Sequence, residues 1–211
     1  MDLLIPGPVG DLEATLWLPK DREKPRAACA FCHPHPLHGG TMNNTVVFRA
    51  SRGLQQAGLA VLRFNFRGVG QSGGDHDGRG GEEGDLKAAL DHLERTFPGV
   101  ELWAGGFSFG SRTAASHALS DARVARVILV AFPVGAFDLS FVTALAKPGL
   151  ILMAGKDEYG TLEQLKMRFP DLYPGLVTDE IPDVNHYFHG ATSELQSRVR
   201  AYAERALERP A

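Results

Sequence analysis

Short apolar runs alternate with amphipathic stretches along most of this chain, and this alternation limits the folds that it can form. The apolar positions of the amphipathic stretches recur every three to four residues, as is typical of helices, over residues 46–57, 86–97 and 195–206. Strand–helix–strand units of this kind join parallel strands, and their helices cover both faces of the sheet. The sequence therefore predicts an α/β fold with a mostly parallel central sheet, whose strands lie at 27–33, 60–66, 101–107, 124–132, 149–155 and 177–183.

The N-terminal segment differs because its apolar residues alternate one by one. Leu12, Ala14, Leu16 and Leu18 are each separated by a single residue, a period of two that indicates a strand. Together with residues 3–5, which precede a Pro-Gly-Pro turn, this strand predicts an antiparallel hairpin. The hairpin brings the predicted sheet to about eight strands.

The composition is that of an ordinary folded protein. Over 211 residues, Lys and Arg total 22 and Asp and Glu total 25, which gives a net charge of −3. This balance disfavours nucleic acid and anionic membrane surfaces as partners, because both attract an excess of cationic residues. The length fits one domain, residues 1–211, acting as a monomer or a homodimer. With neither a basic leader nor a run of about 18 apolar residues, a soluble, cytoplasmic protein is expected.

Two cysteines form a C-x-x-C sequence, Cys29-Ala30-Phe31-Cys32, within the first apolar run. Residues three apart on a strand point to opposite faces and lie about 10 Å apart. This separation is too large for a disulfide. We therefore predict two small core residues and no redox pair.

The sequence Gly106-Phe107-Ser108-Phe109-Gly110 is the strongest indication of chemistry. It is a G-x-S-x-G motif that follows a predicted strand and precedes a helical stretch, which is the context in which such a serine acts as a nucleophile. The sharp turn strains the backbone of Ser108, and the two glycines keep crowding around it low. The helix N-terminus then favours negative charge that develops there.

A nucleophilic serine needs an acid and a base, which follow it in that order along chains with this motif. Asp157 comes directly after a predicted strand, with Glu158 as its neighbouring rival. After the last predicted strand comes His186, our candidate base, with His189 as the alternative. His186 takes the Ser108 proton and later gives it to the leaving group, and Asp157 fixes the tautomer of the imidazole.

The loop over residues 33–40, His-Pro-His-Pro-Leu-His-Gly-Gly, follows a predicted strand. In this arrangement an oxyanion hole combines the backbone N–H after the nucleophile, here that of Phe109, with one from this loop. Both prolines lack an N–H and hold the loop rigid. The second donor is therefore the N–H of His35 or of Leu37, and we favour His35.

The same loop supports a competing hypothesis of metal binding. His33, His35 and His38 resemble a metal-ligand cluster, to which residues 75–77, Asp-His-Asp, could add ligands. A metallohydrolase loop of the H-x-H-x-D-H kind would carry an aspartate where Leu37 stands. A metal-dependent hydrolase is thus an alternative prediction.

Residues 68–73, Gly-Val-Gly-Gln-Ser-Gly, match the G-x-G-x-x-G pattern of dinucleotide sites. Such a site needs a helix that begins at the glycines. Here more glycines and acidic residues follow before any helical periodicity begins. We therefore interpret the match as a coincidence.

With these motifs in place, the sequence resembles the α/β-hydrolase superfamily over nearly its whole length, and most of all the small lid-less bacterial serine hydrolases related to dienelactone hydrolase. The likeness lies in residues 33–44 and 64–72, in the serine motif and in Asn185-His186. The resemblance implies the α/β-hydrolase fold and a structural role for the Arg-Gly-x-Gly-x-Ser stretch beside the site. Dienelactone hydrolases proper use a cysteine nucleophile, whereas Ser108 stands in this chain.

The region where many of these enzymes insert a lid, residues 134–148, is only long enough for one short helix, so a shallow, open site is expected. An aromatic wall would suit a short acyl or aromatic ester, although these side chains could equally belong to the core. The candidate substrate-binding residues are Leu37, Met42, Phe107, Phe137, Tyr159 and Tyr187.

The function predicted from the sequence is that of a serine hydrolase, in particular a carboxylesterase that cleaves small soluble esters through an acyl-enzyme and needs no cofactor. Thioesterase or peptidase activity on the same residues stays open, as do the metal-dependent hydrolase and a non-catalytic binding protein. Arg63, Asn65 and Arg67, which an extended chain places on one face, have no role in this interpretation.

Overall fold

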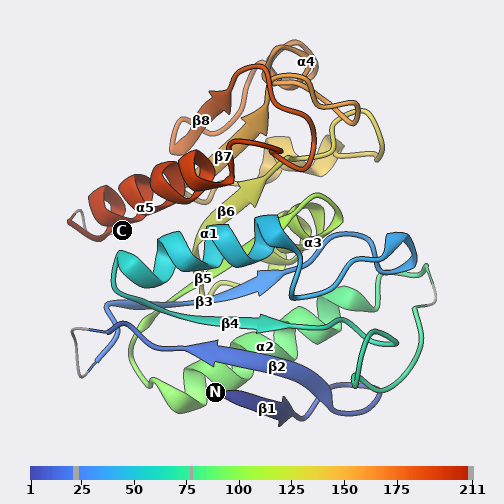
Figure 1. Ribbon diagram of the computed structural model, residues 1–211, viewed down its shortest axis with the longest axis vertical. Helices are drawn as coiled ribbons and strands as arrows, with labels where there is room; N and C mark the ends of the chain where they lie inside the picture. Colours follow the sequence, from blue (N-terminus) through green and yellow to red (C-terminus); the bar gives the residue numbers. More distant parts are fainter. Residues whose placement is uncertain (21–23, 77, 209–211) are drawn as a thin grey trace.

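The computed structural model describes residues 1–20, 24–76 and 78–208, and its centre is a twisted eight-stranded sheet (Figure 1). The strands lie in the order β1-β2-β4-β3-β5-β6-β7-β8. Strand β2 pairs antiparallel with β1 and β4, and the other pairs are parallel, which confirms the predicted α/β fold with its N-terminal hairpin. The strands are β1 Asp2–Ile5, β2 Leu12–Trp17, β3 Ala27–Cys32, β4 Leu59–Phe64, β5 Glu101–Phe107, β6 Val124–Val130, β7 Gly149–Ala154 and β8 Leu176–Ile181.

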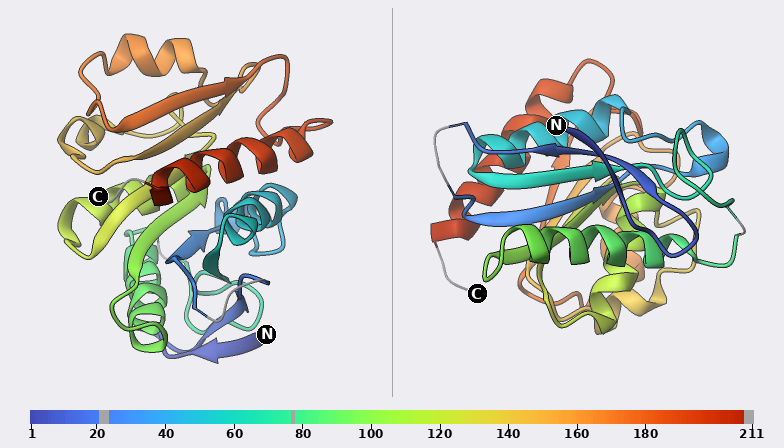
Figure 2. Two further views of the ribbon diagram at one scale, coloured as in Figure 1. Left: turned by 90° about the vertical axis from the view of Figure 1, so that its left-hand side faces the viewer. Right: turned by 90° about the horizontal axis from the view of Figure 1, so that it is seen from below.

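Helices cover both faces of the sheet. Helices α1 (Thr45–Gln56) and α5 (Thr192–Glu208) lie side by side on one face, and α2 (Glu82–Thr96) and α3 (Phe109–Ser120) cover the other (Figures 1 and 2). The short helix α4 (Leu162–Arg168) connects β7 to the edge strand β8. Two apolar cores result, one on each face of the sheet.

The inner strands are buried on both faces. Every residue of β3, β4 and β7 is buried, as expected of parallel strands between two helical layers. Cys29 and Cys32 belong to opposite cores and are free thiols, as the strand geometry predicted. Because burial raises the pKa of both thiols, neither is a ready nucleophile.

Local sequence signals set several element boundaries. Thr161 and Gln164 form the predicted capping box at the start of α4, each side chain accepting the backbone N–H of the other. Helix α1 begins after Asn44, whose Oδ1 accepts the N–H of Val46. Most strands end one or two residues before their predicted bounds, because the chain leaves the sheet there to form the loops at its carboxyl edge.

Of the three polar residues near the end of β4, Arg63 and Asn65 both contact Met42, whereas Arg67 contacts Asp85 on α2, so the three side chains do not all share one face. Arg63 lies with its guanidinium carbon 4.1 Å from the centre of the Trp17 ring and donates to the carbonyl of Met42. Asn65 lies beyond the strand and accepts the N–H of Met42. The two side chains therefore hold the Met42 segment through both its carbonyl and its N–H.

Arg67 lies on the opposite side, in a buried ion pair with α2. Its Nη2 is 2.8 Å from Oδ1 of Asp85, whose side chain is fully buried. The backbone N–H and Nε of Arg67 donate to the same carboxylate. This pair ties the chain just before residues 68–73 to helix α2.

Residues 68–73, the G-x-G-x-x-G match, form a loop with turns. Gly68 and Gly70 have φ of 73° and 58°, values that favour glycine. The next helix, α2, begins only at Glu82. The stretch therefore lacks the helix start that a dinucleotide site needs.

The carboxyl edge of the sheet carries no inserted lid in the described chain. Over residues 134–148 a single short 3₁₀ helix forms, Ser140–Ala144, in keeping with the short length of this region. This leaves the loops at that edge open. Among the described residues, no helix combines the length and apolarity needed to cross a membrane.

Candidate active site

Ser108 occupies the sharp turn between β5 and α3. Its backbone angles, φ 54° and ψ −119°, are rare for a residue with a side chain and mark local strain. A Cβ on Gly106 would overlap the backbone of Gly110, and a Cβ on Gly110 would lie 2.5 Å from the carbonyl oxygen of His33. The flanking glycines are thus required by close backbone approach. The turn places Ser108 at the carboxyl edge of the sheet, at the N-terminus of α3.

Asp157 and His186 follow β7 and β8 and meet at the same edge. His186 Nδ1 lies 2.7 Å from Asp157 Oδ2, and the two side chains are only 3% and 1% exposed. The other carboxylate oxygen accepts the N–H of Tyr159 at 2.8 Å. With Asp157 accepting from its Nδ1–H, a neutral His186 keeps Nε2 as a proton acceptor.

The alternative acid and base candidates, Glu158 and His189, lie outside this contact. Glu158 is exposed, and the exposed His189 contacts the side chain of Asn185 through Nδ1. Ser108 and His186 lie in the wall of one cavity, without a hydrogen bond between them among the described residues. In free enzymes such a contact is often long and tightens only when substrate binds.

The loop after β3 distinguishes the two proposed oxyanion donors. The Leu37 N–H donates to His35 Nδ1 at 3.2 Å, so it is already engaged. The N–H groups of His35 and Phe109 make no hydrogen bond to any described residue. The rings of these two residues are in contact, with centroids 4.9 Å apart. The geometry therefore favours His35 over Leu37 as the partner of Phe109.

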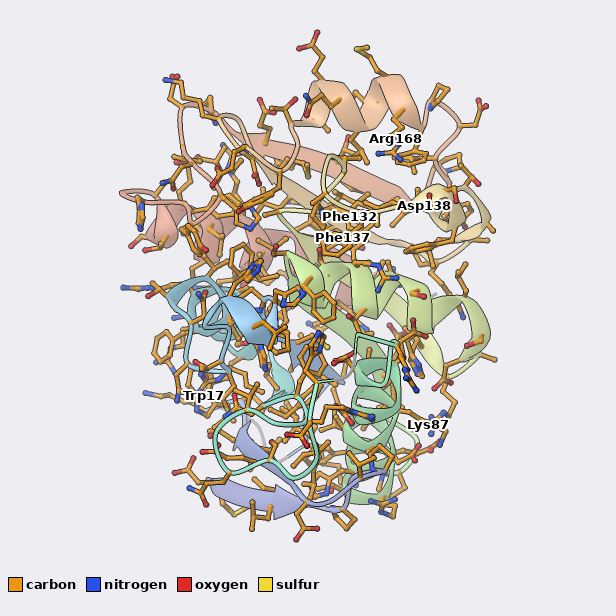
Figure 3. The ribbon with its side chains drawn as sticks, turned by 90° about the vertical axis from the view of Figure 1, so that its right-hand side faces the viewer. Trp17, Lys87, Phe132, Phe137, Asp138 and Arg168 are labelled. Carbon is orange, nitrogen blue, oxygen red and sulfur yellow. The ribbon has the colours of Figure 1, made fainter. Side chains whose placement is uncertain are left out.

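A cavity of about 420 Å³ opens at the carboxyl edge, with Ser108 and His186 in its wall. Figure 3 looks onto this edge, with Phe137 near its centre and Asp138 and Arg168 further toward α4. The wall is largely aromatic and contains no carboxylate among its lining residues. These residues are also Pro34, His35, His38, Gly39, Asn44, Phe109, Pro133, Ala136, Phe137, Tyr159 and Tyr187.

Three predicted substrate-binding residues do not line this cavity. Leu37 is 71% exposed on the outside of the 3₁₀ turn Pro36–His38. Met42 is buried, with its peptide groups held by the polar residues at the end of β4. Phe107 is fully buried and packs against the His186 ring, with centroids 4.9 Å apart. Of the predicted set, the residues that do line it are Phe137, Tyr159 and Tyr187.

Sequence reasoning did not place Asn44, Pro133 and Ala136 at the site. Asn44 lies two residues before Val46, where the helical periodicity begins, and an asparagine at this position is a cap signal that could have been used. Because its Oδ1 accepts the Val46 N–H, its amide nitrogen remains as a donor at the cavity wall. Pro133 and Ala136 follow the carboxyl end of β6, where open α/β sheets bind ligands.

The three histidines of the loop after β3 do not converge as metal ligands would. His33 uses both ring nitrogens, one against the carbonyl of the next residue at 2.6 Å and one accepting the Phe66 N–H at 3.0 Å. Burial lowers the pKa of His33 to about 4. His35 and His38 stack on each other, with centroids 4.6 Å apart. Among the described residues, which exclude Asp77, no group of three or more His, Cys, Asp or Glu is placed to hold a metal ion.

Together, the fold and the serine turn define an α/β hydrolase without a lid. Comparison with known proteins agrees, because the family model for the alpha/beta hydrolase fold matches residues 37–184. The chain belongs to the α/β-hydrolase family.

Solved structures place it near serine hydrolases of this family. An alpha-beta serine hydrolase homologue from Coxiella burnetii is 39% identical, covers 96% of each chain and has a TM-score of 0.87. A serine hydrolase without lid from Xanthomonas campestris is 32% identical, with 100% of this chain and 96% of that chain covered and a TM-score of 0.90. An uncharacterised protein of Rickettsia prowazekii is 33% identical over 183 residues, 81% of this chain and 75% of that protein. The two solved structures support a general hydrolase function.

Proposed function

We propose that this protein is a serine carboxylesterase that cleaves small, soluble esters with Ser108, His186 and Asp157. The observation that carries the proposal is the buried contact of 2.7 Å between His186 Nδ1 and Asp157 Oδ2, beside a cavity whose wall contains both His186 and the strained Ser108. A buried carboxylate beside the imidazole fixes its tautomer and stabilises the imidazolium that forms during the reaction.

In the proposed reaction, Ser108 Oγ attacks the ester carbonyl carbon while His186 Nε2 takes its proton. The carbonyl oxygen becomes an oxyanion, which accepts hydrogen bonds from the N–H groups of Phe109 and His35. The carbon–oxygen bond to the alcohol breaks, and the alcohol leaves with the proton from His186. Water then attacks the acyl-enzyme, with His186 as base, to release the acid and restore Ser108.

The dimensions of the cavity support a small substrate. About 420 Å³ falls at the lower end of the range for small-molecule sites. Phe137 and Tyr187 offer flat apolar surface for a short acyl or aromatic group, and Asn44 offers an amide donor. We propose one α/β-hydrolase domain over residues 1–211 as the unit that carries this site.

A labelling experiment tests the nucleophile. Wild type is treated with a fluorophosphonate probe and assayed on p-nitrophenyl acetate, beside Ser108→Ala and the control Ser116→Ala. Ser116 lies on the same helix and donates to Glu83 outside the cavity lining. We expect Ser108→Ala to lose labelling and at least about 10⁴-fold in kcat, and Ser116→Ala to keep both. Activity and labelling retained in Ser108→Ala would refute the proposal.

Two further arms distinguish the alternatives. A chelator is expected to leave the rate of ester hydrolysis unchanged. Loss of activity on chelation would favour the metal-dependent hydrolase. Matched acetyl esters, thioesters and anilides are compared by kcat/KM, and we expect the ester to be cleaved fastest. An amide or thioester preference would retain Ser108 as nucleophile but reassign the substrate class.

A further inference from the structure

A second pair of carboxylate and imidazole lies beside the cavity and has no part in the proposed reaction. Glu82, the first residue of α2, has a side chain only 1% exposed, and its Oε1 lies 2.5 Å from Nδ1 of His76. Its other oxygen, Oε2, is buried and has no hydrogen-bond partner among the described residues. A carboxylate oxygen buried in this way is costly, and such a group calls for a specific explanation.

The His76 ring faces the residues that carry the proposed oxyanion donors. It lies edge-on to the His35 ring at 5.1 Å and to the Phe109 ring at 6.1 Å, measured between centroids. His35 and Phe109 also contact each other, and both line the cavity. The His76 side chain is 9% exposed and is not among the lining residues, so it packs behind the residues that line the cavity.

We propose that Glu82 and His76 are a positioning pair that holds His35 and Phe109 so that their N–H groups stay aimed at the oxyanion. The inference rests on the proposed function. The contact to Glu82 fixes the tautomer and orientation of the His76 ring, because a carboxylate accepts only from a protonated Nδ1. The fixed ring then limits how far the His35 and Phe109 rings can move.

Such restraint matters because oxyanion donors accelerate the reaction only when they are already in place. The loop after β3 is anchored by other contacts, including the bond from Phe66 N–H to His33 Nε2. The His35 ring, however, touches only aromatic neighbours and its own loop in the contacts described. The His76 ring is the one of these neighbours that is tied to a buried carboxylate on a helix.

The protein offers a matched control on α3. His117 forms the same kind of pair with Asp121, at 3.1 Å between Nε2 and Oδ2, with side chains 9% and 10% exposed. Neither residue lines the cavity. Replacing His117 therefore removes a largely buried His–carboxylate contact without touching the proposed oxyanion loop.

The experiment compares His76→Phe, Glu82→Leu and Glu82→Gln with His117→Phe, each at a concentration of active sites counted with the fluorophosphonate probe. We expect kcat to fall about 10-fold in His76→Phe and Glu82→Leu, with KM changed less than about 2-fold, because oxyanion donors act on the transition state. Glu82→Gln keeps an acceptor for Nδ1–H and should retain more activity than Glu82→Leu. The affinity for phenylboronic acid, whose adduct with Ser108 is tetrahedral, should fall in parallel with kcat.

The control His117→Phe should keep the wild-type kcat and boronate affinity. An unchanged kcat in His76→Phe and Glu82→Leu, or an equal loss in His117→Phe, would overturn the inference. If His76→Phe does not fold, the two Glu82 variants decide the question. Failure of the proposed function looks different, because it leaves Ser108 unlabelled in the wild type.

Discussion

Acid should destabilise this protein partly through His33. In the folded state Nε2 of His33 must stay unprotonated to accept the Phe66 N–H, and burial lowers the pKa from 6.5 to about 4. The unfolded chain takes up the proton near the ordinary value. Between these pH values the unfolded state therefore binds more protons, so this contribution to stability is complete above about pH 6.5 and declines as the pH falls toward 4. At about 1.4 kcal/mol for each pH unit, the free energy of unfolding falls by about 3 kcal/mol across this window.

Urea unfolding of wild type and His33→Gln, followed by circular dichroism from about pH 7 to about pH 4, measures this contribution. Glutamine does not titrate, and the other histidines are common to both proteins. We expect His33→Gln to be less stable at neutral pH, because its flexible amide accepts the Phe66 N–H in a less fixed geometry than the buried imidazole, and to depend less on pH. Between about pH 7 and about pH 4, wild type should lose about 3 kcal/mol more of its free energy of unfolding than His33→Gln. Parallel curves would refute the assignment of this pH dependence to His33.

Three other outcomes are expected. Asp157→Asn should lower kcat about 10⁴-fold while Glu158→Gln leaves it near wild type, and equal effects in steady-state assays would contradict the choice of acid. Asp85→Asn should lower the free energy of unfolding by about 3 kcal/mol, because the buried guanidinium of Arg67 loses its carboxylate; a melting temperature within 2 °C or so of wild type would argue against a structural ion pair there. Phe137→Ala should raise the KM for an aromatic ester about 10-fold, whereas Leu37→Ser should leave it unchanged, because Leu37 is exposed outside the cavity lining. A higher KM in Leu37→Ser than in Phe137→Ala would instead support the sequence prediction that Leu37 contacts the substrate.

Much of the α/β fold could be predicted from the sequence because it depends on local periodicity. Continuous apolar runs identified the buried strands, and single-residue alternation identified the N-terminal hairpin. The serine turn was equally clear, since a strand, two glycines and a helix start are all encoded within a few residues. The opposite orientations of Cys29 and Cys32 also followed from strand geometry alone.

The tertiary structure decided which residues surround Ser108. Leu37, Met42 and Phe107 have the chemistry of lining residues, yet only packing shows that one faces solvent and two face the core. Asn44 reaches the cavity because α1 begins beside it.

Contacts between residues far apart in the chain have no periodic signature. The bond of Phe66 N–H to His33, the ion pair of Arg67 with Asp85, and the row of rings that links Glu82 to the loop after β3 each join segments brought together by the sheet. A local pattern specifies the direction in which a side chain leaves its strand or helix. The residues that this side chain contacts depend on elements elsewhere in the sequence. For this reason the sequence alone determined the fold and the candidate nucleophile, whereas the residues that line the cavity and those that pack behind them were decided by the tertiary structure.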